Sequence, residues 1–358
     1  MKTIKADSVI FLLGAGCSRN ADIKTSNEMI LEIENLINSY NVEWNTHRLL
    51  YYYVKSAILY ADGVQGIFDN NVNIERLVGV LRDLKKKERN PIYPFIGNWN
   101  EKLIELAGER FCNIDAFDRK LSEKIVDFVT LNKETEKRVS YYKKFYEFQR
   151  EIEASIRIFS LNYDQCVEKA KPPEYDLECG FGEDDIWSAD RFNAKSITAG
   201  IYLYKLHGSI DWKRDKSKGN VLVKYDVPQS DAELIFGTDA KLQSVDPFLF
   251  NVYELRNYSL LSKVIVIIGY SFNDPYVNDL LAQALNNLSS RNLLIVDPYS
   301  STIKELDRKK YILSRLGLDE QHKDQIFLER LTAKEYLETN LTREIIGNYI
   351  KDNDDIFK

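Results

Sequence analysis

Cysteine and histidine are scarce in this sequence, which has only four and three of them among 358 residues. No two cysteines form a C-x-x-C pair, the close spacing that places two thiolates on one structural zinc ion. There is no close cluster of histidine and cysteine either, so we expect no bound metal. The cysteines, which we expect to be reduced thiols, are Cys17, Cys112, Cys166 and Cys179.

Long apolar runs are also missing. No run approaches the roughly 18 residues that a membrane-spanning helix needs. The first residues lack a signal-peptide pattern, because the apolar run from Val9 is short and ends in glycine. We therefore expect a cytoplasmic protein that does not enter a membrane. The formal net charge of −6 favours no direct binding of nucleic acid, and the basic run 82–89 is typical of a solvated helix end.

What the sequence does contain is a series of short apolar runs. Helical patterns separate the later ones, and this alternation predicts an α/β fold, a Rossmann-like parallel sheet flanked by helices. The runs expected to form strands are 9–13, 156–161, 201–206, 221–224, 264–268, 293–296 and 325–329.

A block of helical periodicity interrupts this series. Residues 41–150 contain several amphipathic patterns and few glycines, which predicts a large α-helical insertion. The flanking segments, 1–40 and 151–345, would together form the nucleotide-binding domain. Before the insertion, Thr25 and Glu28 have the spacing of a capping box, which predicts the start of a helix.

Small, polar or ionisable residues follow five of the expected strands. Ligands of open α/β sheets bind at the carboxyl ends of the strands, so these residues predict a lined cleft. The segments that follow the strands are Gly14-Ala15-Gly16-Cys17-Ser18, Asn162-Tyr163-Asp164, His207-Gly208-Ser209, Gly269 to Asp274, and Asp297-Pro298.

The first of these turns does not fit the common nucleotide fingerprints. Arg19 occupies the place of the third glycine in G-x-G-x-x-G, and the P-loop motif is absent. A classical NAD dehydrogenase and a P-loop NTPase are both disfavoured. Gly14 and Gly16 still permit a tight turn and a close approach to phosphate, and Ser18 can add a hydroxyl.

The motifs "GAGCS", "LNYD", "LHGS", "IIGYSFND" and "IVDP", in this order, resemble the sirtuin superfamily. They are most similar to its Sir2-type branch in bacterial anti-phage defence. The resemblance implies a domain that binds NAD as substrate and cleaves the nicotinamide–ribose bond. In the defence branch it implies net NAD hydrolysis to ADP-ribose and nicotinamide, which depletes NAD in an infected cell.

The resemblance also assigns roles to residues. Asn162 would contact the nicotinamide ribose and position the attacking group. Asp164 would support that loop and the nicotinamide side, and His207 would be the catalytic histidine. The residues expected to bind NAD are Gly14, Ala15, Gly16 and Ser18 at the pyrophosphate, Ser271 near phosphate or ribose, Asp297 near the adenosine ribose, and Gly269.

The chemistry supports a histidine in this role. Breaking the bond to nicotinamide creates an oxocarbenium-like centre, and a base near neutral pH can activate the attacking water. Among the three histidines, His207 alone follows an expected strand and precedes a glycine. The alternatives are a buried structural histidine, and turn-forming roles for Asn162 and Asp164.

Two departures weaken a lysine-deacylase function. The segment after the histidine motif, "HGSIDWKRDKSKGNVLV", has no cysteine where deacylating sirtuins carry a zinc module, and "RNADIKTSNE" lacks their proline- and arginine-containing segment. An NAD-dependent deacylase or ADP-ribosyltransferase remains an alternative, as does a non-catalytic module that binds NAD or ADP-ribose. A homo-oligomer is expected, and family analogy suggests a HerA-type ATPase or another defence-system protein as partner.

Overall fold

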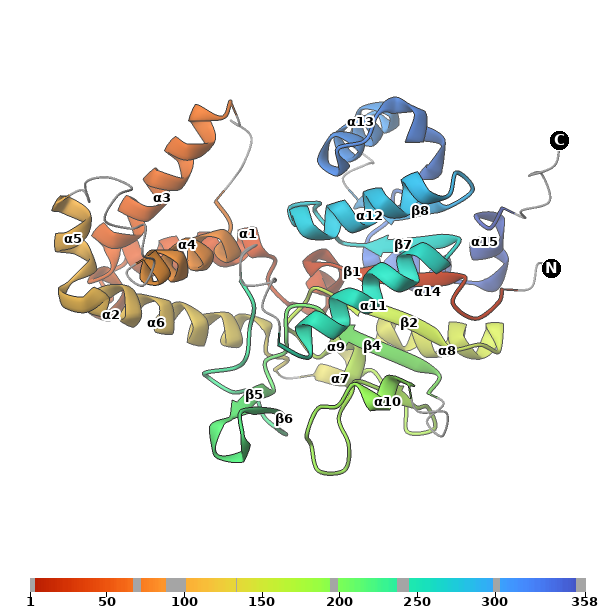
Figure 1. The fold of residues 1–358 in the computed structure, drawn as a ribbon, viewed down its shortest axis with the longest axis horizontal. Coiled ribbons are helices and arrows are strands. Elements are labelled where there is room, and N and C mark those ends of the chain that lie inside the picture. The colour runs from red at the N-terminus through yellow and green to blue at the C-terminus, as the bar shows by residue number, and fades with distance from the viewer. Residues whose placement is uncertain are drawn as a thin grey trace. The chain divides into compact units, whose positions relative to one another are not determined.

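The computed structural model describes residues 4–66, 72–87, 101–132, 134–193, 199–236, 245–298 and 303–351 (Figure 1). The chain divides into two compact units. A sheet unit comprises Met1–Ile23, Thr130–Leu234 and Lys241–Lys358, and a helical unit comprises Lys24–Val129 and Ile235–Ala240. The domain boundaries expected from the sequence, at residues 40, 41, 150, 151 and 345, stay a prediction.

In the described part of the sheet unit, seven strands form one parallel sheet in the order β3-β4-β2-β1-β7-β8-β9. This confirms the predicted Rossmann-like α/β fold. From β1 the chain builds outward through β2 and then returns to β7 on the other side of β1, so the topological switch point lies between β1 and β7. The strands are β1 (Val9–Leu13), β2 (Ile156–Ser160), β3 (Leu177–Glu178), β4 (Ile201–Lys205), β7 (Val264–Ile268), β8 (Asn292–Val296) and β9 (Ile326–Glu329).

Helices cover both faces of this sheet (Figure 1). On one face, Ile10 and Leu12 of β1 belong to a core with α11 (Phe248–Leu261), α12 (Pro275–Asn287) and α13 (Glu305–Leu316). On the other face, Phe11 packs edge-to-face on Phe145 of α8 (Lys143–Ile152). Successive strand residues point to opposite faces, and every residue of β1 is buried. Burial on both faces is the reason why the strand sequences are continuously apolar.

The described part of the sheet unit also contains shorter helices. They are the 3₁₀ helices η1 (Ala15–Ala21), η4 (Ser140–Tyr142), η5 (Lys216–Lys218) and η8 (Glu320–Gln325), and the helices α7 (Thr135–Arg138), α9 (Cys166–Lys169), α10 (Asp190–Asn193), α14 (Ala333–Thr339) and α15 (Arg343–Asn348).

The structure differs from the sequence expectation in three places. The strand predicted at 221–224, β6 (Val221–Lys224), is outside the parallel sheet and pairs antiparallel with β5 (Trp212–Asp215). Neither β5 nor the two-residue β3 was predicted. Residues 15–21, expected as a turn and loop, form the 3₁₀ helix η1.

The helical unit contains α1 (Ser26–Asn38), α2 (Val42–Asn45), α3 (Arg48–Val64), α4 (Ile74–Lys87), α5 (Glu101–Ala107), the 3₁₀ helix η3 (Glu109–Phe111) and α6 (Cys112–Val129). The predicted capping box is confirmed, since Thr25 and Glu28 exchange both hydrogen bonds at the start of α1. Ion pairs from Arg82 to Asp118 and from Lys85 to Asp115 link α4 to α6, so much of the basic run is paired with carboxylates. Among the described residues, no helix has both the length and the apolar character that crossing a membrane requires.

Candidate active site

The register of the sheet aligns the carboxyl ends of five strands. Leu13 of β1 pairs with Ser160 of β2 on one side and with Ile268 of β7 on the other. Ser160 in turn pairs with Lys205 of β4, and Ile268 with Val296 of β8. The five segments expected to line a cleft therefore leave the sheet at the same level, with neighbouring strands about 4.8 Å apart. Asn162 and His207 are each two residues beyond a paired strand residue.

Three of the predicted NAD-binding glycines, Gly14, Gly16 and Gly269, pack backbone against backbone at the switch point. The Gly14 N–H donates to Ile268 O, and the Gly16 N–H donates to Gly269 O, both at 2.9 Å. A Cβ added to Gly14 would lie 2.6 Å from Gly269 O. Close approach of β1 to β7 thus explains the glycines here, and their contact with a nucleotide stays a prediction.

Ser18 and Asn162 connect the first turn to the loop after β2. The Asn162 Nδ2 donates to Gly14 O at 3.0 Å and to Ser18 Oγ at 3.2 Å. Ser18 is fully buried on η1, and its hydroxyl also lies 2.8 Å from the hydroxyl of Tyr142. The structure therefore brings together two residues that are far apart in sequence, and in this state their polar groups bind each other. The predicted contacts of Ser18 with phosphate and of Asn162 with ribose are not tested.

Asp164, in the loop after β2, accepts hydrogen bonds through its side chain and its carbonyl group. Its Oδ1 accepts from the Cys166 N–H at 2.9 Å, at the start of α9. Its carbonyl oxygen accepts from the ammonium of Lys205, a fully buried side chain that also lies 3.4 Å from Glu168. Burial alone would lower the pKa of Lys205, but the carboxylates of Glu168 and Asp164 outweigh it and raise this pKa. These contacts link Asp164 to α9 and β4, and its role at the site stays a prediction.

His207 lies buried at the end of β4. Its Nε2 is 3.3 Å from Oδ2 of Asp274, and the two side chains are 4% and 7% exposed. Its Nδ1 is buried and has no hydrogen-bond partner among the described residues. The next residue, Gly208, has φ +89°, and a Cβ there would lie 2.0 Å from Glu233 O. Glycine is therefore required directly after the histidine.

Asp274 belongs to a segment expected to line the cleft, but the sequence indicated no individual role for it. It is the N-cap of α12, where Oδ1 accepts from the N–H groups of Tyr276 at 3.1 Å and Val277 at 3.4 Å. The signal for this cap was present in the sequence, because an aspartate followed by proline is typical of a helix start. The second carboxylate oxygen, Oδ2, faces His207 because of the fold, and the sequence carries no signal for this contact.

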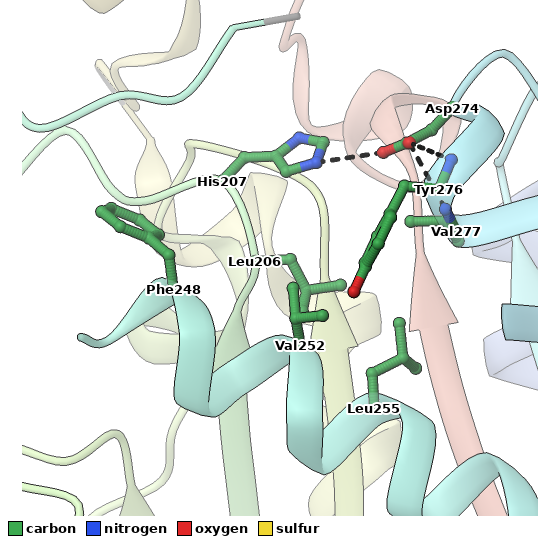
Figure 2. Close-up of a pocket in the computed structure, with 8 residues that line it drawn as sticks. All are labelled: Leu206, His207, Phe248, Val252, Leu255, Asp274, Tyr276 and Val277. Carbon is green, nitrogen blue, oxygen red and sulfur yellow. Dashed lines mark hydrogen bonds and ion pairs between the residues drawn. The ribbon is translucent and has the colours of Figure 1, made fainter. Parts of the chain in front are cut away.

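Figure 2 shows His207 and Asp274 at the edge of a small pocket above α11. The pocket has a cavity volume of about 10 Å³, which is about the minimum that can hold one water molecule. A ring-sized ligand therefore requires side chains to move. The lining residues are Leu206, His207, Phe248, Val252, Leu255, Asp274, Tyr276 and Val277.

The remaining predicted NAD-binding residues, Ala15, Ser271 and Asp297, differ in exposure and in contacts. Ala15 opens η1, and Ser271 is exposed in the loop after β7. Asp297, directly after β8, is buried and forms an ion pair with Arg308 of α13 at 2.6 Å. The register places Asp297 level with Gly269, but its carboxylate is engaged by α13. Its contact with an adenosine ribose stays a prediction.

Two further observations concern thiols and metals. Burial raises the pKa of the Cys17 thiol, on the first turn, to about 12, so this thiol is not a reactive group. In the described ranges, no group of three or more histidine, cysteine, aspartate or glutamate side chains could hold a metal ion. The absence of a metal remains an expectation from the sequence.

Part of the chain, including the carboxyl ends of β2, β4 and β7, matches a known protein family. Residues 156–319 match the model of the SIR2-like domain family. This match supports the sirtuin superfamily. It covers Asn162, His207 and Asp274 but not the first turn, and it does not distinguish a branch of the superfamily. A search of curated proteins found no match to the chain.

Solved structures of Sir2 homologues are similar to the chain at low identity. One is a mutant Sir2 homologue in complex with 2'-O-acetyl ADP ribose, with 12% identity, a TM-score of 0.44, and coverage of 97% of this chain and 94% of that chain. Another is a Sir2 homologue in complex with NAD, with 13% identity, a TM-score of 0.39, and coverage of 95% and 90%. At these values neither likeness bears on the activity of this chain.

Proposed function

We propose that this protein is an NAD glycohydrolase, which converts NAD and water to ADP-ribose and nicotinamide. The observation that carries the proposal is the buried His207, whose Nε2 faces a carboxylate and whose Nδ1 has no partner among the described residues. It stands at the carboxyl edge of a parallel sheet, within a segment that matches the SIR2-like domain family.

The proposed reaction uses few groups. Nicotinamide leaves as a neutral molecule, so the enzyme does not have to protonate the leaving group. What the site has to supply is a polar setting for the ribose, a placed water, and a base that takes a proton from the attacking group. His207 would be this base. Asn162 would orient the ribose and the water, and Asp164 would hold the Asn162 loop, as its hydrogen bond to Cys166 indicates.

The substrate would lie along the switch point. In this proposal the pyrophosphate faces the first turn, from Gly14 and Ala15 through Gly16 to Ser18. Gly269 and Ser271 would border it on the β7 side, and Asp297 would be near the adenosine ribose. The pocket at His207 would have to open to admit the nicotinamide ring, because its present volume of about 10 Å³ is near the minimum for one water molecule.

The test is to incubate purified protein with NAD and to measure free nicotinamide by chromatography. We expect His207→Ala and Asn162→Ala each to lower turnover by about 10²–10⁴-fold, the range for loss of a positioned base. His322→Ala is the matched control, since His322 is also buried but lies before β9 at the opposite edge of the sheet, where its Nε2 is 3.9 Å from the exposed carboxylate of Asp319. Near wild-type turnover of either site variant refutes the assigned site.

The same assay separates the alternatives. A protein deacylase or an ADP-ribosyltransferase releases nicotinamide only when an acylated peptide or another acceptor is added. A binding module releases none under any condition. For the hydrolase we expect release without acceptor and ADP-ribose in equal amount.

We infer that the biological role is anti-phage defence by NAD depletion. This inference rests on the resemblance of the sequence motifs. Because an unregulated NADase would be toxic to its own cell, we expect its activity to depend on assembly into a homo-oligomer or with a HerA-type ATPase.

A further inference from the structure

We propose that Asp274 is a positioning residue that holds His207 in one tautomer, with the hydrogen on Nε2, so that Nδ1 is the nitrogen that accepts a proton. The juxtaposition of a helix-capping carboxylate and a buried imidazole at the end of another strand carries this inference. It deepens the proposed function, because it names the reacting atom of the proposed base.

For a neutral His207, the hydrogen-bond chemistry of the pair allows one arrangement. An ionised carboxylate only accepts hydrogen bonds, so the ring nitrogen that faces it has to carry a hydrogen. In a neutral imidazole the other nitrogen is then a bare acceptor. For His207 the nitrogen that faces Asp274 is Nε2, at 3.3 Å, and the bare nitrogen is Nδ1.

Hydrogen bonds to its own helix and loop orient the Asp274 carboxylate independently of His207. Its Oδ1 accepts from two N–H groups in the first turn of the 13-residue helix α12, where the helix dipole favours a negative charge. The Asp274 N–H donates to the Tyr270 hydroxyl at 3.2 Å, and that hydroxyl donates to Oδ1 of Asn278 at 2.8 Å. The two carboxylate oxygens of Asp274 therefore have different partners. Oδ1 accepts the hydrogen bonds of the helix cap, and Oδ2 faces His207.

The unpartnered Nδ1 points to a ligand that donates. A buried polar atom without a hydrogen bond costs free energy, and a hydroxyl or water of a bound ligand would satisfy it. The ligand group expected here is therefore a hydrogen-bond donor, and in the proposed reaction it is an O–H group whose proton His207 takes.

A second histidine in the chain supplies an internal reference. His322 Nδ1 lies 2.7 Å from Oε1 of Gln325, whose Nε2 donates to the carbonyl oxygens of Leu288 and Arg291. These bonds identify Oε1 as the amide oxygen, so Nδ1 of His322 has to carry the hydrogen. The two buried histidines are thus expected to be opposite tautomers.

The first experiment reads the tautomers directly. Protein labelled with ¹⁵N-histidine contains three histidines, and His207→Gln and His322→Gln assign two of them in long-range ¹H–¹⁵N spectra. We expect the Nε2–H pattern for His207 and the Nδ1–H pattern for His322. An Nδ1–H pattern for His207 in the wild type overturns the proposal.

The second experiment uses two substitutions that both preserve the helix cap, because asparagine and serine are good N-cap residues. In Asp274→Asn the cap needs an oxygen at the Oδ1 position, which places an NH₂ group against His207 Nε2. We expect the tautomer to invert and kcat to fall by about 10²–10⁴-fold, as for a base held in the wrong tautomer. In Asp274→Ser the shorter side chain does not reach the ring, so we expect mixed tautomers and a smaller loss of kcat.

KM should change little in either variant, because the change is in proton transfer. Asp319→Asn, next to His322, is the control and should alter neither the His207 spectrum nor turnover. Wild-type kcat in Asp274→Asn overturns the positioning role, since a merely structural cap tolerates asparagine. If the wild type releases no nicotinamide, the proposed function fails, and the tautomer spectra alone decide whether Asp274 fixes His207.

Discussion

Alanine in place of Gly269 should destabilise the sheet unit more than alanine at positive-φ glycines of the same unit where an added Cβ would meet open space. Gly269 has φ +67°, and an added Cβ would lie 2.2 Å from Cys17 N. The left-handed backbone costs a residue with a side chain about 1–2 kcal/mol. Forcing an atom into a packed contact costs about 1–3 kcal/mol more. We therefore expect Gly269→Ala to lose about 2–5 kcal/mol of unfolding free energy, a large share of the about 5–15 kcal/mol of a typical protein.

Two glycines in the same unit are matched controls. Gly219 and Gly317 have φ +82° and +66°, and a Cβ at either would meet no atom within 4 Å. Gly219→Ala and Gly317→Ala should therefore lose only the backbone cost, about 1–2 kcal/mol. The difference from Gly269→Ala isolates the clash with the first turn.

The assay is urea denaturation followed by circular dichroism, with each variant compared with the wild type. If Gly269→Ala does not accumulate as folded protein, Gly16→Ala is the milder substitution, because its Cβ would lie 2.9 Å from the Cα of Gly269. Equal midpoints for Gly269→Ala and Gly317→Ala would refute the reasoning. The glycine would then be explained by approach to a ligand instead of by contact between β1 and β7.

Two further predictions concern thiols and assembly. Burial raises the pKa of Cys17 to about 12 and that of Cys166 well above its usual value. Alkylation of the native protein, followed by mass spectrometry, should therefore modify the exposed Cys112 and spare Cys17 and Cys166. Labelling of Cys17 in folded protein would contradict its burial. Molar mass and NAD turnover, measured together across protein concentration and with a genetically neighbouring ATPase, should rise together; a strictly monomeric protein with full activity and no partner effect would contradict gating by assembly.

The parts of the fold that the sequence predicted are those with a strong local signal. The strands β1, β7 and β8 are buried at every position, so their apolar runs stand out. In contrast, β3 has two residues, and β5 is polar at three of its four positions, so neither has a periodicity to detect. The partner of Val221–Lys224 was also unpredictable, because a strand of a separate two-stranded sheet and a strand of the large sheet have the same local pattern.

The candidate site was predictable in its residue types but not in its contacts. His207 and Asn162 were found because functional residues of α/β sheets follow strands. Asp274 lies 67 positions after His207, and its own sequence context is explained by a helix cap, so nothing local indicates the contact. The same holds for Ser18, which lies 124 positions before its partner Tyr142. Such contacts follow from strand order and register, which a single sequence does not display.

Asn162 differs from His207 because both of its amide hydrogen bonds are made within the chain, to Gly14 O and to Ser18 Oγ. Each bond contributes about 0.5–1.5 kcal/mol, so Asn162→Ala should lose about 1–3 kcal/mol of unfolding free energy in addition to turnover. Asn162→Asp should be worse than alanine, because it replaces the donor that faces a carbonyl oxygen with a negatively charged acceptor.

Asn273→Asp is the matched control. The Asn273 side chain accepts from Arg315 at 2.9 Å, and a carboxylate accepts equally well, so this variant should keep the wild-type urea midpoint. If Asn162→Ala loses turnover but no stability, the two hydrogen bonds contribute nothing to the fold, and Asn162 acts on the ligand alone. If Asn162→Asp is as stable as the wild type, the donor assignment toward Gly14 O is wrong. We expect loss of both stability and turnover. This result would mean that Asn162 orders the first turn and also helps to place that turn at the substrate.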